Sequence, residues 1–500
     1  MSIQNKLSYA AIKKLQPKSS RYKIGDGDKL WLVVSPSGTK TWRILWKVNG
    51  VQRDYTICSA ALAENAGNPV SLKDSIEAML RSNHSLKSIQ ENRSAVGHEI
   101  DKAKAGYGPR VDLTARGGFG RLTNSTVRDY GYNRVAPYSS ASLILTQPLW
   151  DSWLTRGRVR EAEATYRSMD HRVMDNANSL ALDAIIAHID VLRRRQIYAL
   201  AQDNVERHED ILGKAREREA LGVDTMADVT KAQSRLSRAK STLSEAKSSL
   251  KVGEETYARL TRIVPGKLAE VKRPEGMYKN ADEVLRDARR FNPKVSAYME
   301  DVIAARARKE QANSAYGPSL AIEAGPSYSE RDRISRMWTF EFGIAAVLRW
   351  NIFNSGADVA ESKAAAARIR QARQTLYDYM DELKLNVNQS WTEYVSAQEQ
   401  LEFYKEAIEY NIATRDAYQE QFILGERSLL DVLDAESELF NSSTQAATAL
   451  GNSLIAAYRM KALAGALIPS FNISTEMLKT TPADHEPLDS ITLPKDSEGK

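Results

Sequence analysis

The chain contains two copies of one pattern, and this internal repeat constrains its fold more than any other feature of its 500 residues. Residues 83–113 align without a gap to residues 292–322, and residues 221–236 likewise parallel residues 424–439. A period of about 205 residues means that each copy holds a series of helices and strands rather than one short repeat unit. The two copies are therefore expected to follow the same plan.

Each copy begins with a helix that ends at Tyr-Gly-Pro, because proline cannot continue a helix and disfavours helical backbone in the residue before it. These helix-to-strand junctions are at Pro109 and Pro318. Segments that alternate between apolar and polar residues follow, as in residues 109–117, 139–147 and 338–348. Such alternation over about ten residues is typical of a membrane barrel strand. A half-buried soluble sheet has the same alternation.

Very long helices come next in each copy. Residues 357–424 contain neither Gly nor Pro, which predicts a continuous helix of roughly 100 Å at about 1.5 Å per residue. Residues 158–221 are similar and are interrupted only by Gly213. A coiled-coil-like seam runs along the second helix at Val387, Trp391, Tyr394, Leu401, Tyr404 and Ile408. A soluble coiled coil would have such helices, but it does not explain paired strands at matching places in both copies.

The expected strands are too few to form a barrel within one chain. Four strands cannot close a barrel, and an open sheet edge is not tolerated in lipid. If these strands enter a membrane, several chains must pool them, and three chains would give about twelve strands, which lies in the usual range. No apolar run approaches the roughly 20 residues of a transmembrane helix.

The positive charge of the chain is concentrated at its front. Residues 1–57 contain eight Lys and three Arg against three Asp, whereas the whole chain has a net charge of +6. We interpret this segment as a short helix followed by a small antiparallel sheet, with alternation in 29–34 and 41–48 and a hairpin turn at Asn49-Gly50. Basic residues mixed with tryptophans suit a DNA-binding face, and equally a soluble surface around a small core. The basic residues concerned are Lys29, Lys40, Arg43, Lys47 and Arg53.

Residues 7–57 resemble the N-terminal arm-binding domain of phage- and island-type tyrosine integrases. The resemblance rests on "LSYAAIKKLQPK" and "YKIGDGDKLWLVVSPSGTKTWRILWKVNG", and it implies that the sheet docks into DNA. Recombinase activity is not expected, because none of the six histidines begins the His-x-x-Arg motif that the catalytic domain needs.

Cys58 is the single cysteine, so no intrachain disulfide can form.

Residues 64–470 resemble the outer-membrane factor family, the TolC-type channels. The resemblance rests on the repeat, on the Tyr-Gly-Pro junctions and above all on "LGERSLLDVLDAESELFNSS". It implies a mostly helical fold with β-structure. Long helical hairpins would form a tunnel, and the four transmembrane strands of each chain would contribute to a trimeric, twelve-stranded β-barrel, with a small α+β domain in front.

The same resemblance implies a passive outer-membrane channel of a type I secretion or tripartite efflux system. Its expected partners are two further copies of the chain, outer-membrane lipid, a periplasmic adaptor protein and an inner-membrane ABC or RND transporter. DNA is an expected partner of residues 1–57 only. No enzymatic activity, cofactor or metal site is expected, because no catalytic constellation is visible in the sequence.

Two hairpin tips, at 221–229 and 424–432, hold the expected functional residues. Thr225 with Asp228, and Ser428 with Asp431, have the spacing of capping boxes. We also expect the tips to be the docking site of the adaptor. The residues assigned to both roles are Gly222, Thr225, Gly425 and Ser428.

Asp434 lies one helical turn beyond Asp431 on the same face and is not needed for a cap. The resemblance places the periplasmic gate of the family at these two carboxylates. In a threefold assembly they would form two stacked rings, in which like charges raise one another's pKa values and bind cations. By motif position, the links that hold the closed state fall on Arg427, Phe422 and Asp228. Phe422 has no hydroxyl group to donate, but Arg427 and Asp228 are able to pair.

The segment "SAALA" at 59–63 has the small-x-small form of an export cleavage site, yet it follows an alternating, charged stretch. We interpret it as a remnant of an export signal, with an ancestral mature chain starting at Glu64. Outer-membrane and periplasmic localisation is expected from the resemblance, although the sequence leaves open whether the joined chain is exported. The alternatives are a DNA-binding protein with a coiled-coil body and a gene fusion without function.

The expected divisions are residues 1–57, a junction at 58–70, repeats at 71–279 and 280–470, and a disordered tail at 471–500.

Overall fold

The structure is a computed structural model. It describes the backbone of residues 22–27, 30–34, 40–48 and 51–59, and then residues 69–121, 135–331, 337–473 and 478. Several sequence-based expectations lie outside the described residues: the N-terminal helix, Lys29, the turn at 49–50, most of the junction, and the end of the tail from residue 479.

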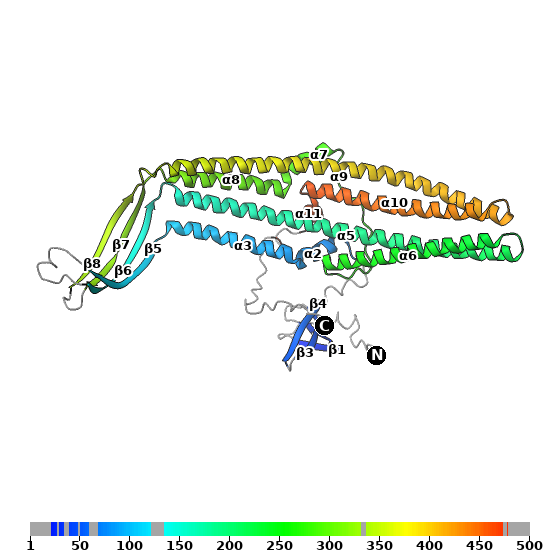
Figure 1. Cartoon of the computed structure of the whole chain (residues 1–500), viewed down its shortest axis with the longest axis horizontal. Coiled ribbons are helices and arrows are strands. Elements are labelled where there is room, and N and C mark those ends of the chain that lie inside the picture. The colour runs from blue at the N-terminus through cyan, green and yellow to red at the C-terminus, as the bar shows by residue number, and fades with distance from the viewer. Residues whose placement is uncertain are drawn as a thin grey trace. The chain divides into compact units, whose positions relative to one another are not determined.

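The front of the chain contains a four-stranded antiparallel sheet in the order β1-β2-β3-β4 (Figure 1). Its strands are β1 (Tyr22–Gly27), β2 (Leu30–Val34), β3 (Lys40–Val48) and β4 (Val51–Ser59). The alternation in the sequence thus predicted this sheet correctly. β4 continues beyond the boundary expected at residue 57, because Cys58 pairs with Trp42 and Ser59 with Thr41 on β3. The cleavage-like stretch therefore begins inside a strand.

A second four-stranded antiparallel sheet follows the order β5-β6-β7-β8. It consists of β5 (Arg110–Arg121), β6 (Val135–Trp150), β7 (Ser319–Arg331) and β8 (Met337–Arg349). β5 and β7 begin directly after the junction prolines, Pro109 and Pro318 respectively, as expected. β6 pairs with β7, so the sheet joins the two repeat copies and leaves β5 and β8 as its edges.

The helices repeat in the same order in both copies. In the first, α3 (His84–Lys104) and η2 (Ala105–Tyr107) precede the strands, and α5 (Leu154–Ala220) and α6 (Met226–Thr261) follow them. In the second, α8 (Pro293–Ser314) precedes the strands, and α9 (Ala357–Leu424) and α10 (Leu429–Leu463) follow them. The long helix predicted at 357–424 agrees with α9 end to end. The shorter helices are α2 (Leu72–Ser82), α7 (Ala281–Phe291) and α11 (Leu467–Ser470).

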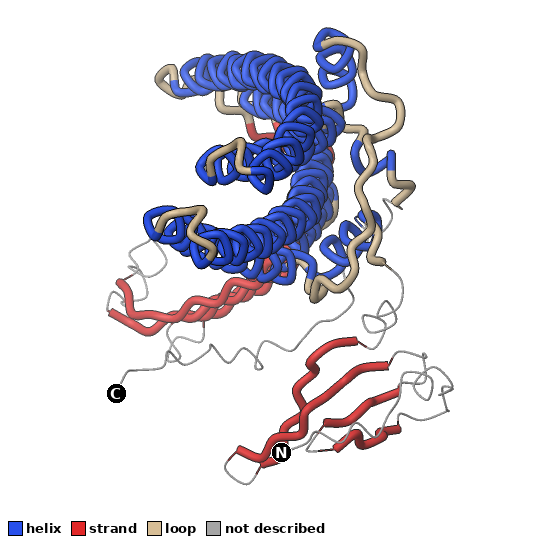
Figure 2. The backbone as a smooth tube through the Cα atoms, turned by 90° about the vertical axis from the view of Figure 1, so that its right-hand side faces the viewer, coloured by secondary structure: helices blue, strands red, loops and turns tan. Residues whose placement is uncertain are grey.

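The long helices form two antiparallel hairpins, α5 with α6 and α9 with α10, which lie side by side (Figures 1 and 2). The predicted seam on α9 faces inward: Val387 is fully buried, and Trp391 and Tyr394 are partly buried. Within the described residues, no helix combines the length and the apolar character needed to cross a membrane.

The chain divides into two compact units, and each takes segments from both repeat copies. One unit comprises residues 1–83, 180–277 and 389–460, which include the turns of both hairpins. The other comprises residues 84–179, 278–388 and 461–500, which include the sheet β5–β8. The compact units thus cut across the divisions that the repeat suggests, because equivalent elements of the two copies pack beside each other.

Candidate gate at the hairpin tips

Both hairpins turn at a glycine with left-handed backbone conformation. Gly222 lies just beyond the end of α5 with φ of +77°, and Gly425 directly follows α9 with φ of +80°. The N–H of Val223 donates to the carbonyl of Arg218 at 2.9 Å, which closes the C-terminus of α5 as a Schellman motif, and the second turn repeats this bond. A Cβ atom at either glycine would meet no atom within 4 Å. The left-handed backbone, rather than crowding, therefore favours glycine here.

The expected capping residues bond as capping residues do. The hydroxyl of Thr225 donates to the Asp228 carboxylate at 2.6 Å, and the Thr225 N–H donates to the same carboxylate at 3.3 Å. This hydrogen bonding lowers the pKa of Asp228, because it favours the charged carboxylate. On the second tip, Ser428 donates to Asp431 at 2.9 Å, and the Asp431 N–H donates back to the Ser428 hydroxyl oxygen at 3.3 Å. Asp228 and Asp431 therefore each fix the first turn of a helix.

Asp434 has a partner that the sequence did not predict. Its Oδ1 accepts a hydrogen bond from Nη2 of Arg235 at 2.9 Å, which links α10 to α6. The Asp434 side chain nevertheless remains 58% exposed. No sequence spacing points to this pair, because 199 residues separate the two partners.

Within the single chain, Arg427 contacts residues other than Asp228. Arg427 donates to Gln421 at 3.0 Å, lies 3.8 Å from Asp431 and places its guanidinium 4.5 Å from the centre of the Tyr418 ring. All these partners belong to its own hairpin. Asp228 is held at its own tip by Thr225, as described above.

Phe422, which falls on a gate position by motif, is a core residue in the single chain. Its side chain is 4% exposed and belongs to an apolar cluster that both hairpins share. A phenyl ring without a polar group is stable there, because burial needs no hydrogen-bond partner. The tip cluster consists of Val205, Ile211, Leu212, Ala215, Ala232, Leu236, Ala239, Phe422, Leu429, Val432 and Leu433.

Arg218, near the end of α5, is a tip residue that no sequence motif marks. Its Nε lies 2.9 Å from Asp224, and its Nη1 donates to the Phe422 carbonyl at 2.9 Å and to the Ile423 carbonyl at 3.3 Å. Its guanidinium carbon lies 4.6 Å from the centre of the Phe422 ring. The Arg218 side chain therefore crosses from the first hairpin to the second.

A buried acid lies farther along α10. Glu436 is 2% exposed and accepts a hydrogen bond from Gln419 at 2.9 Å. Arg207 and Arg415 approach its carboxylate at 3.8 Å and 3.9 Å. Burial raises the pKa of Glu436, and the two guanidinium groups counteract only part of this effect.

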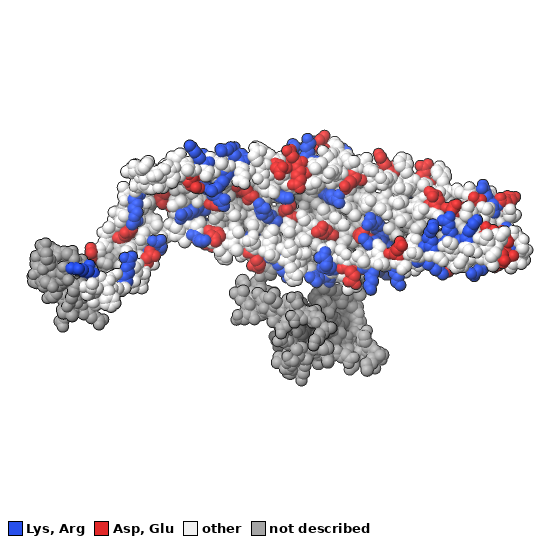
Figure 3. Space-filling view, viewed as in Figure 1, with Lys and Arg blue, Asp and Glu red and all other residues white. Residues whose placement is uncertain are grey.

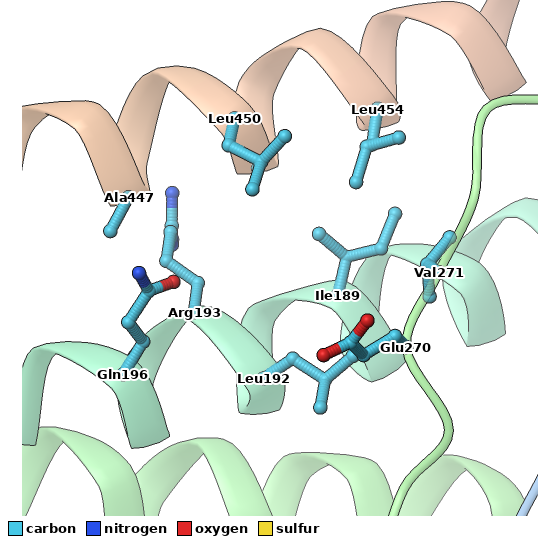
Figure 4. A pocket seen from close by; sticks show the side chains of 10 residues that line it. Ile189, Leu192, Arg193, Gln196, Glu270, Val271, Ala447, Leu450 and Leu454 are labelled. Carbon is cyan, nitrogen blue, oxygen red and sulfur yellow. The ribbon is translucent and has the colours of Figure 1, made fainter. Parts of the chain in front are cut away.

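An apolar groove of about 480 Å³ lies between α5, α10 and the extended segment at Glu270 (Figure 4). Ile189 of α5 faces Leu450 and Leu454 of α10 across it, and Leu192 also lines it. Glu270 also lines the groove. The groove is lined mainly by aliphatic side chains, and within the described residues no group of His, Cys, Asp and Glu is arranged to hold a metal ion.

Charged side chains of both signs are interspersed over the hairpins near their turns (Figure 3). The geometry of the tips therefore consists of two matched, capped turns, a shared apolar core and pairs of opposite charge. Nothing in this arrangement activates a nucleophile, but it is suited to holding two helical hairpins in register.

The family profile described as "Outer membrane efflux protein" matches residues 75–262 and 284–466. The chain belongs to the outer membrane efflux protein family. The two matched stretches coincide with the two repeat copies, and residues 1–57 lie outside them. An outer membrane efflux protein is a transport channel of efflux and type I secretion systems and not an enzyme, which agrees with the expectations from the sequence.

Individual relatives share the fold at low sequence identity. Outer membrane efflux protein BepC of Brucella suis is 22% identical over 429 residues, which cover 85% of this chain and 90% of the relative. The match to the structure of the Campylobacter jejuni CmeC outer membrane channel covers 79% of this chain and 86% of the CmeC chain. The sequence identity is 14% and the TM-score is 0.67. The match to the open-state structure of the Neisseria gonorrhoeae MtrE channel covers 79% of this chain and 89% of the MtrE chain. The sequence identity is 17% and the TM-score is 0.64.

Proposed function

We propose that three copies of this chain form one continuous export duct that closes at the hairpin tips. The observation that carries this proposal is the sheet β5–β8, which is open at both edges and bears exposed apolar side chains. Unpaired backbone groups at β5 and β8 are not tolerated in lipid, so the sheet must be completed by neighbouring copies. Three copies would pool twelve strands, an even number in the range of outer-membrane barrels.

The exposed residues of β8 support a lipid-facing role for one side of this sheet. Alternate side chains between 338 and 348 are apolar and 60–72% exposed in the single chain: Trp338, Phe340, Phe342, Ile344 and Leu348. Trp150, Trp153 and Trp350, at or just beyond the ends of the strands, are also exposed. Aromatic residues at the ends of an apolar band match the girdles of barrel proteins at the membrane interface.

The proposed gate consists of Asp431 and Asp434 from each chain. Three copies would place six carboxylates at the closed end of the tunnel, where they would bind cations. Arg235 neutralises part of this charge, since it holds one oxygen of Asp434. Arg427 and Asp228 remain candidates for contacts between neighbouring copies, because both are partly exposed at the tips.

The proposed partners follow from this arrangement. The capped turns at 222–225 and 425–428 form the exposed ends of the hairpins, where a helical hairpin of a periplasmic adaptor would dock. An inner-membrane ABC or RND transporter would deliver the cargo. The repeats at 71–279 and 280–470 are the proposed functional body of the chain.

Conductance of the purified full chain in a planar lipid bilayer tests the duct. We expect discrete channels of low conductance that multivalent cations block from the side of the tips. Replacing both gate acids, Asp431→Ala with Asp434→Ala, is expected to weaken this block. The absence of any channel would contradict the duct, and an unchanged block would contradict the gate assignment.

For residues 1–57 we propose DNA binding as a separate activity. The described sheet β1–β4 is antiparallel, and β3 and β4 contain Lys40, Arg43, Lys47 and Arg53. A gel-shift measurement with the full chain and duplex DNA tests this. Arg43→Ala with Lys47→Ala should weaken binding, whereas Lys240→Ala on α6 should not. Equal binding by all three proteins would contradict the proposal.

A further inference from the structure

Arg218 belongs to the first hairpin, but its guanidinium binds the end of the second. The carbonyls of Phe422 and Ile423, at the C-terminus of α9, both accept hydrogen bonds from its Nη1. The Arg218 side chain is 18% exposed, and that of its partner Asp224 is 14% exposed. The Arg218–Asp224 pair is therefore less exposed than the Arg235–Asp434 and Arg427–Asp431 pairs of the tips.

The physical chemistry of a helix end explains why this contact is strong. The last carbonyls of a helix have no partner within the helix and carry the negative end of its dipole, so a cation placed there is stabilised. Hydrogen bonds from a charged donor are roughly twice as strong as neutral ones. The Phe422 ring adds a cation–π contact with its centre 4.6 Å from the guanidinium carbon of Arg218.

Asp224 keeps the guanidinium in this position. Its carboxylate lies 2.9 Å from Nε of Arg218, and its own N–H lies 3.3 Å from the Arg218 carbonyl. The turn after α5 thus binds both the side chain and the backbone of the same arginine. Movement of the Arg218 guanidinium away from the second hairpin would therefore also break its contact with Asp224.

We propose that Arg218, oriented by Asp224, is the clamp that holds the two hairpin tips of one chain together and keeps the duct closed. The proposal rests on the duct function. The segment it holds leads directly through the turn at Gly425 to Asp431, in the first turn of α10. Release of the α9 terminus would therefore move a gate carboxylate. Arg218 acts through the position of this carboxylate and is a positioning residue.

The tips retain other contacts when the clamp is removed. The tip cluster contains side chains from both hairpins, such as Leu236 of α6 and Leu433 of α10. Removal of the Arg218 side chain is therefore expected to loosen the last turn of α9 without unfolding the hairpins.

The clamp is tested with Arg218→Ala and Arg218→Lys in the full chain, with Arg216→Ala as the matched control. Arg216 lies on the same helix but bonds to Gln233 within its own hairpin. Amide hydrogen exchange is measured over residues 419–426, and channel opening is measured in planar bilayers. Arg218→Ala should speed exchange at least about tenfold and raise the open fraction. The exchange rate and open fraction of Arg218→Lys should lie between those of wild type and Arg218→Ala. Lysine keeps the charge but lacks the planar guanidinium group with its several hydrogen-bond donors. Arg216→Ala should match wild type in both measurements.

Unchanged exchange in Arg218→Ala would overturn the clamp. Faster exchange without a higher open fraction, in a chain that conducts, would overturn its role in closing the duct. A wild-type chain that forms no channel would instead contradict the duct function, and the exchange measurement would then decide by itself whether Arg218 holds the tips together.

Discussion

Asp434 of α10 accepts a hydrogen bond from Arg235 of α6 at 2.9 Å. The pair connects a proposed gate carboxylate to the neighbouring hairpin of the same chain. It also means that the ring of charge at the tunnel end would contain arginines as well as aspartates. We therefore expect Arg235 to weaken cation binding at the proposed gate.

Replacing Arg235 with alanine should strengthen cation block of the channel. Loss of the guanidinium leaves both oxygens of Asp434 free and makes the tunnel end more negative. We expect the blocking concentration of a multivalent cation to fall several-fold in planar bilayers. Arg238→Ala, which removes an exposed arginine one turn further along α6, is the control and should resemble wild type. A block weaker than wild type in Arg235→Ala would contradict this account.

Replacing a capping residue should loosen one tip only. Thr225→Ala removes the hydroxyl that bonds to Asp228 and should cost about 1 kcal/mol of local stability at the start of α6. Hydrogen exchange over residues 226–232 should rise accordingly, while residues 429–435 keep the wild-type rate. Ser428→Ala should show the reverse pattern. Equal effects of either variant on both tips would indicate that the tips open as one unit.

Phe422 should behave as a core residue. Phe422→Ala removes a ring that is 4% exposed and should cost about 3–5 kcal/mol locally, since a cavity is left in the tip cluster. Protease cleavage between residues 421 and 428 should become much faster. Phe422→Leu keeps an apolar side chain and should be cleaved only slightly faster than wild type. Resistance of Phe422→Ala equal to that of wild type would show that the ring does not stabilise the tip.

Glu436 should make the stability of the protein depend on pH. Its pKa is raised in the folded chain, so the folded state binds the proton more tightly than the unfolded state. The stabilisation is fully present below the ordinary pKa of a glutamate and is lost as pH rises through the raised value. The melting temperature of Glu436→Gln minus that of wild type should therefore increase from about pH 4 upward. Glu438→Gln, at an exposed neighbouring position, serves as the control. A difference in melting temperature between Glu436→Gln and wild type that does not change with pH would contradict the prediction.

The architecture was predictable because it depends on local patterns. The absence of Gly and Pro between 357 and 424 fixed the extent of α9, and the prolines at 109 and 318 marked where β5 and β7 begin. Gly222 and Gly425, with the acids three residues after Thr225 and Ser428, marked the two turns. Each of these signals is contained within a few neighbouring residues or one uninterrupted run.

The contacts between the hairpins were not predictable in this way. Arg218 reaches Phe422 across 204 residues, and Arg235 reaches Asp434 across 199. Nothing in the sequence around either arginine distinguishes it from the many solvated arginines on these helices. The burial of Phe422 was not predictable either, because a motif position conveys the place of a side chain on its helix but not which neighbours cover it.

The most direct test of the account is the state of the full chain in membranes. Outer membranes are separated from inner membranes and soluble protein, and the chain is analysed by gel electrophoresis with and without heating. We predict that it is recovered in the outer membrane as a species of three times the mass of one chain, which heating converts to the single chain. Recovery of a monomer in the soluble fraction alone would contradict the proposed duct.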